Sequence, residues 1–112
     1  MAKEIFHRAD AGEAIISIPT VCFAETVYLV EAGKFSAPSY VRLIETLLQH
    51  EEGSYRIIPF TMAVVKAFPR VPRTAIPELP DRMIAATALH LGLPLITKDE
   101  AIRGWDGITT LW

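Results

Sequence analysis

Residues 81–97, DRMIAATALHLGLPLIT, carry the clearest structural signal in the sequence. The first part has the apolar spacing of a helix, with Asp81 at or near its start and Gly92 just past its end. The segment LPLIT, residues 93–97, follows at once and has the composition of a buried strand. This stretch therefore predicts a helix that leads directly into a strand.

The same alternation of strands and helices runs through the rest of the chain. Further helices are expected within residues 2–11, 21–32, 38–52 and 61–68 and in a short segment after Thr97, and further strands within residues 15–19, 55–60 and 107–112. The strands are nearly continuous apolar runs, which favours a mostly parallel sheet with helices on both faces. We therefore expect a single α/β domain over residues 1–112.

Local signals at the ends of these elements are also specific. Thr20 is placed to cap the second helix, and Gly53 to end the third. Thr97 and Glu100 have the spacing of a capping box, which would leave Asp99 with no part in the cap. The proline-rich connection PRVPRTAIPELP, residues 69–80, cannot be a regular helix or an inner strand, and such a loop often borders a site.

Composition excludes several classes of protein. With 11 basic and 13 acidic residues and a formal charge of −2, the chain lacks the generally basic surface that binds nucleic acid through its backbone alone. A single cysteine, Cys22, gives no intramolecular disulfide, and no stretch resembles a secretory signal. No uncharged run is long enough to span a membrane. We expect a cytoplasmic protein without a membrane segment.

Acidic side chains mark a candidate site. In a parallel α/β sheet, the ends of the strands and the starts of the following helices meet at one edge, where Asp81, Asp99 and Glu25 can all lie. Each has a simpler explanation: Glu25 can be a solvent-exposed residue at a gap in the packing, and the aspartates suit helix starts. Three carboxylates that converge repel one another unless a cation neutralises them. Oxygen ligands alone suit Mg²⁺ or Mn²⁺, and such ions support phosphodiester hydrolysis.

Residues beside these carboxylates are candidates for substrate binding. Arg82 follows Asp81 and Lys98 precedes Asp99, so both could contact phosphates, or they could be plain surface cations. Thr97 could orient a water at the metal, or act as a helix cap and nothing more.

Three segments resemble a known family. IPTVCFAETVYLVEAGK around Glu25, LPDRMIAATALHLGLPLIT around Asp81 and TKDEAI around Asp99 are similar to the PIN-domain ribonucleases, especially the VapC-type toxins of toxin–antitoxin pairs. The resemblance spans essentially the whole chain. It implies that Glu25, Asp81 and Asp99 are three of the acidic metal-binding positions. It further implies RNA hydrolysis with Mg²⁺ or Mn²⁺, a homodimer, and inhibition by a small antitoxin whose tail occupies the active site.

One departure from the family pattern concerns the start of the sheet. Family members begin with a central strand that carries the first catalytic Asp, whereas this sequence starts at what resembles the following helix. We therefore expect an N-terminally truncated PIN-like fold with weak activity, in which residues 15–18 and 93–97 pair directly, leave a gap or borrow a strand. The alternatives are a non-catalytic PIN-like remnant that binds an antitoxin or another copy of itself, and a small-molecule-binding α/β module.

Overall fold

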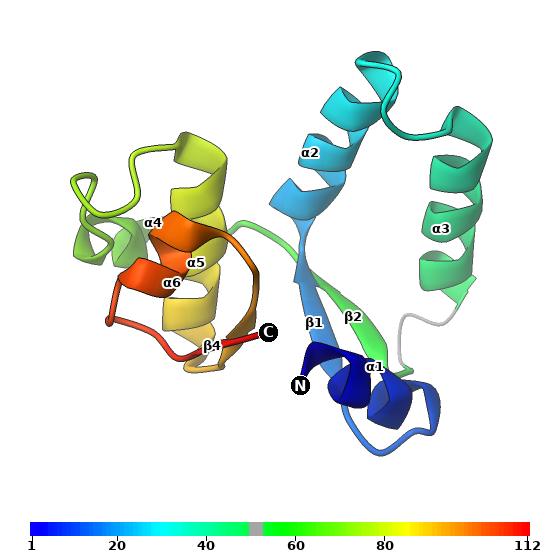
Figure 1. Ribbon diagram of the computed structural model, residues 1–112, viewed down its shortest axis with the longest axis horizontal. Helices are drawn as coiled ribbons and strands as arrows, with labels where there is room; N and C mark the ends of the chain where they lie inside the picture. The colour runs from blue at the N-terminus through cyan, green and yellow to red at the C-terminus, as the bar shows by residue number, and fades with distance from the viewer. Residues whose placement is uncertain (50–52) are drawn as a thin grey trace. The chain divides into compact units, whose positions relative to one another are not determined.

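The computed structural model describes residues 1–49 and 53–112, in which short strands lie between single helices or groups of consecutive helices (Figure 1). In chain order the elements are α1 Ala2–Asp10, β1 Ile16–Pro19, α2 Thr20–Glu31, α3 Ala37–Gln49, β2 Tyr55–Ile58, α4 Met62–Ala67, the 3-10 helix η1 Phe68–Arg70, α5 Leu79–Leu91, β3 Leu95–Ile96, α6 Glu100–Gly104 and β4 Thr110–Leu111. The α/β class and every helix and strand expected from the sequence are confirmed. The predicted stretch of the third helix just before Gly53 lies outside the described residues.

The chain divides into two compact units. We call Lys3–Pro59 the N-terminal unit, and Phe60–Trp112 together with Met1–Ala2 the C-terminal unit. β1 and β2 belong to the first, and β3 and β4 to the second. The single domain expected over residues 1–112 stays a prediction. None of the described helices combines the length and the apolar character that crossing a bilayer requires.

Strand pairing is parallel in both units. β1 lies beside β2 with Ile16 opposite Tyr55, and β3 lies beside β4 with Leu95 opposite Thr110. Each unit of the described chain thus contains one two-stranded sheet, and which of the three options applies to residues 15–18 and 93–97 stays a prediction. The parallel direction is confirmed, whereas the truncation and the coverage of one sheet on both faces stay predictions.

In the N-terminal unit, α1 ends in a turn at Gly12, whose φ of +78° is readily adopted by glycine. The hydroxyl of Tyr55 donates a hydrogen bond of 2.6 Å to Oδ1 of Asp10, which ties the end of α1 to the start of β2. The predicted cap at Thr20 is wrong. Pro19 is the extended residue before α2, and Thr20 is already helical, so its side chain lies too late in the chain to cap that helix.

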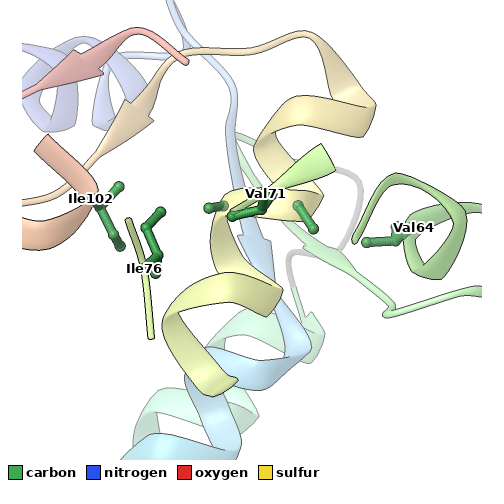
Figure 2. Packing of buried hydrophobic residues seen from close by; sticks show 6 residues of the cluster. Val64, Val71, Ile76 and Ile102 are labelled. Carbon is green, nitrogen blue, oxygen red and sulfur yellow. The ribbon is translucent and has the colours of Figure 1, made fainter. Parts of the chain in front are cut away.

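The C-terminal unit contains the main hydrophobic core of the described residues. Residues from α4, the connection after it, α5 and α6 meet there (Figure 2), namely Val64, Val71, Ile76, Ala85, Ala86 and Ile102. The alanines on α5 leave room for the larger side chains that pack on that helix. α5 ends as expected at Gly92, which adopts a left-handed φ of +67°. This core holds the start of α5, the element that carries Asp81.

Candidate active site

Asp81 lies in the first turn of α5 and is half-buried. Burial raises the pKa of the Asp81 carboxyl, and the negative charges of Asp99 and Glu78 raise this pKa further. Asp81 and Asp99 are therefore within electrostatic reach of each other, although they are far apart in the sequence. Glu78, three residues before Asp81, joins them. Glu78 was not singled out from the sequence, because it lies in the proline-rich connection before the helix, where no helical spacing links it to Asp81.

The residue that caps α5 is not Asp81. Glu78 precedes the helix in extended conformation and makes no side-chain capping bond. Within the described residues, no hydrogen bond involves the carboxylate of Asp81, so the helix-cap alternative for this residue is not supported. Its carboxylate instead experiences the negative charges of Asp99 and Glu78.

Asp99 has a structural role as well as its charge. Its Oδ1 accepts a hydrogen bond of 3.0 Å from the backbone N–H of Ile102, which makes Asp99 the N-cap of α6. The capping box predicted for Thr97 and Glu100 is therefore wrong, because α6 begins at Glu100 itself. The hydroxyl of Thr97 instead accepts from the N–H of Asp99 at 3.1 Å, which fixes the turn between β3 and α6.

Glu25 lies on α2 in the N-terminal unit and is half-buried. Burial raises the pKa of the nearby Cys22 thiol to about 11, and the charge of Glu25 adds to that shift. This thiol is therefore protonated and unreactive at neutral pH. The expectation that Glu25 joins Asp81 and Asp99 stays a prediction.

Residues 2–107 match the PIN domain family. The chain belongs to the PIN-domain family. PIN domains are generally nucleases and generally use divalent metals. The curated proteins give no match to this sequence.

The donor set in the C-terminal unit of this PIN domain fits a divalent cation in type. Asp81 and Asp99 offer carboxylate oxygens, and burial together with the charges of Asp99 and Glu78 raises the pKa of Asp81, a shift that a bound cation would oppose. Hard cations such as Mg²⁺ and Mn²⁺ prefer such oxygens. Among residues 1–49 and 53–112, however, no group of three or more His, Cys, Asp or Glu side chains is placed to hold a metal ion. Asp81 and Asp99 are the two candidate ligands that lie within electrostatic reach of each other in the C-terminal unit.

The two cations predicted to bind substrate both contact aromatic rings. The Arg82 guanidinium lies 4.2 Å from the centroid of the Phe68 ring and donates to backbone carbonyls of the preceding connection. The Lys98 ammonium lies 5.9 Å from the Trp112 ring centroid, and its side chain is exposed. Lys98 is thus free to approach a phosphate from solvent, whereas most donors of Arg82 are already engaged.

The double role of Asp99 in this PIN domain gives a first prediction. Asp99→Asn keeps a good N-cap but removes the charge, whereas Asp99→Ala removes both. We expect the free energy of unfolding to change by less than about 0.5 kcal/mol in Asp99→Asn and to fall by about 1 kcal/mol in Asp99→Ala. Both variants should bind Mn²⁺ more weakly. Urea unfolding and calorimetry measure the two effects, and equal unfolding curves for the two variants would contradict the capping role.

Proposed function

We propose that this PIN domain is a metal-dependent RNA endonuclease of the VapC toxin type. The observation that carries the proposal is the half-buried Asp81, whose pKa is raised by burial and by the charges of Asp99 and Glu78. Perturbed carboxyl groups gather at functional sites because binding a cation there relieves their repulsion. Glu25 enters the proposed site from the sequence pattern and the family resemblance.

Each residue has a distinct part in the proposed mechanism. Asp81 and Asp99, with Glu25, hold Mg²⁺ or Mn²⁺ through carboxylate oxygens, and the hydrogen bond from Ile102 keeps the Asp99 carboxylate in one orientation. A bound ion supplies the Lewis-acid chemistry of phosphodiester hydrolysis. Lys98 is proposed to contact RNA phosphates. For Arg82, whose Nε and Nη2 donate to backbone carbonyls, the phosphate contact expected from the sequence stays a prediction and is the alternative to the role argued below. Thr97 orients water at the site through the hydroxyl proton that its bond with Asp99 leaves free.

Cleavage of RNA in the presence of Mn²⁺ tests this function. The wild-type chain should cleave single-stranded RNA with Mn²⁺ and stop when EDTA is added. We expect Glu25→Gln to lower the affinity for Mn²⁺ by at least about 10-fold, because losing a metal ligand or a side chain that supports one has an effect of this size. The rate of RNA cleavage should fall as well. Glu31→Gln, an exposed change on the same helix, is the matched control and should behave as wild type.

Each outcome of that experiment decides between the candidates. A wild-type chain that neither binds Mn²⁺ nor cleaves RNA would leave the non-catalytic binding module as the better hypothesis. Cleavage that persists at full rate in Glu25→Gln would remove Glu25 from the proposed ligands and leave the nuclease function in place.

The proposed partners are a second copy of the chain and a small antitoxin, in the cytoplasm. The supporting observation for a homodimer is an apolar face on α3, where Val41 is 51% exposed and Leu48 is 58% exposed. These residues are seven positions apart and therefore share one helix face. The antitoxin is proposed from the family resemblance alone.

A charge on that face should separate the copies. Sedimentation at micromolar concentration should give more than the monomer mass for wild type and the monomer mass for the double variant Val41→Glu with Leu48→Glu, because two buried carboxylates oppose association. Gln49→Glu, also exposed on α3, serves as the control and should sediment like wild type. A monomeric wild-type chain would refute the homodimer.

A further inference from the structure

Arg82 contacts the chain that leads into its own helix. Its Nη2 donates to the carbonyl oxygen of Val71 at 2.8 Å, and its Nε donates to the same oxygen at 3.3 Å. A longer contact of 3.5 Å joins Nη2 to the carbonyl oxygen of Phe68. The guanidinium carbon lies 4.2 Å from the centroid of the Phe68 ring. One side chain on α5 thus contacts both ends of the turn formed by residues 68–71.

That turn is anchored in the core. Val71 is 0% exposed and belongs to the core cluster, and Phe68 packs against the same cluster. The Phe68 ring also meets the ring of Phe60 edge to face, with the centroids 6.4 Å apart. Arg82 therefore connects the start of α5 to a part of the chain that packing already holds in place.

The first turn of α5 has no side-chain cap within the described part of the chain. Glu78 precedes the helix without a side-chain capping bond, and Pro80 in the first turn has no N–H to donate. The backbone N–H of Arg82 donates to the carbonyl of Glu78 at 3.0 Å, so Arg82 lies in the turn that also carries Asp81. Fixing the Arg82 side chain consequently fixes the direction of this first turn.

We infer that Arg82 is a positioning residue, whose guanidinium ties the 68–71 turn to the first turn of α5 and so holds the Asp81 carboxylate beside Asp99. The link to metal and RNA rests on the proposed nuclease function. Only a planar guanidinium can place two N–H groups on one carbonyl while it stacks on a ring; a lysine ammonium carries the same charge without that geometry. Charge and geometry can therefore be separated by substitution.

Arg82→Lys and Arg82→Met test this role, with Arg70→Met as the control, since Arg70 is exposed in the same turn. We expect both Arg82 variants to lose hydrogen-exchange protection at the Val71 amide, which bonds to the carbonyl of Phe68, while the Ile102 amide stays protected. Mn²⁺ affinity should fall by about 10-fold, which is the usual effect of losing a side chain that supports a metal ligand, and kcat should fall too. KM and the salt dependence of RNA binding should not change.

Several results would overturn the inference. Wild-type behaviour of Arg82→Lys would show that charge suffices, and a salt slope reduced by about one with kcat unchanged would identify a phosphate contact instead. If the Val71 amide keeps its hydrogen-exchange protection in Arg82→Met, the Arg82 side chain does not hold the 68–71 turn in place. If Arg82→Met does not fold, Phe68→Leu removes the ring under the guanidinium, and Phe60→Leu is its control because it removes the edge-to-face ring contact but leaves the ring under Arg82. Phe68→Leu should lower protection at Val71 and Mn²⁺ affinity more than Phe60→Leu does, and equal effects would count against the role. If the wild-type chain neither cleaves RNA nor binds Mn²⁺, both the nuclease function and the role of Arg82 at a metal site are refuted. If the wild-type chain is active and the Arg82 variants behave like it, only the positioning role of Arg82 is refuted.

Discussion

Asp81→Asn is expected to lower RNA cleavage by about 10²- to 10³-fold, a loss typical for removal of one group that stabilises charge at a reacting centre. Asparagine has nearly the same shape as aspartate, so the first turn of α5 should keep its structure. The variant should also lose most of the Mn²⁺ binding seen by calorimetry, because a neutral amide is a weaker ligand than a carboxylate. Cleavage at the wild-type rate would exclude Asp81 from the site.

The same substitution should stabilise the metal-free protein at neutral pH. The pKa of Asp81 in the folded chain lies above its ordinary value of 3.8, so the folded state holds this proton more tightly than the unfolded state. The stability that this preference contributes is fully present below the unfolded pKa and is lost as the pH rises through the folded pKa. Ionised Asp81 therefore opposes folding at pH 7, and asparagine removes that effect.

Thermal melting can measure both consequences. Without metal, the Tm of Asp81→Asn should exceed that of wild type at pH 7, and the difference should shrink at pH 4. With Mn²⁺ present, the order should reverse, since only wild type gains stability from the bound ion. Asp106→Asn is the control: Asp106 is exposed in a turn of the same unit, and asparagine suits turns equally well. A wild-type Tm above that of the variant at pH 7 without metal would contradict the electrostatic explanation.

Gly107→Ala should destabilise the C-terminal unit strongly. A Cβ atom at Gly107 would overlap the indole ring of Trp105, which packs against the core. The ring must move out of its place or the backbone must shift, and such overpacking costs about 1–3 kcal/mol. For a chain of this size, each lost kcal/mol corresponds to a fall in Tm of roughly 4–8 °C.

Gly104→Ala is the matched control for this effect. A Cβ atom at Gly104 would have no neighbour within 4 Å, and Gly104 has no left-handed φ. Urea unfolding followed by tryptophan fluorescence should therefore separate the two variants, with Gly104→Ala within about 0.5 kcal/mol of wild type. Equal stability of the two alanine variants would show that Trp105 can relax without loss.

Local signals were sufficient to locate the elements of this fold. Gly12 and Gly92 end their helices in left-handed conformations, because their positions follow the last apolar turn of each helix. The short apolar runs became parallel strands, as their composition indicated. Which strands pair could not be predicted, because pairing depends on contacts between residues far apart in the sequence, and it produced two separate pairs of strands in the described residues.

The candidate site was only partly accessible from the sequence. The pairing of Asp81 with Asp99 followed from the rule that strand ends and helix starts share an edge, and the pKa of Asp81 agrees with it. The cap of α6 was misassigned because the helix starts two residues later than expected, which exchanges Thr97 for Asp99 as the capping residue. The partners of Arg82 lie 11 and 14 residues earlier in the chain, beyond any local pattern.

The cap at Asp99 limits which residues evolution or design can place at this position. Folding alone would accept Asn, Ser or Thr there, since each offers an oxygen to the N–H of Ile102. Metal binding alone would accept Glu, whose longer side chain keeps the carboxylate. Aspartate is the one residue that combines a short capping side chain with a full negative charge. Asparagine at position 99 is therefore the substitution that removes the charge and leaves the start of the helix after β3 intact.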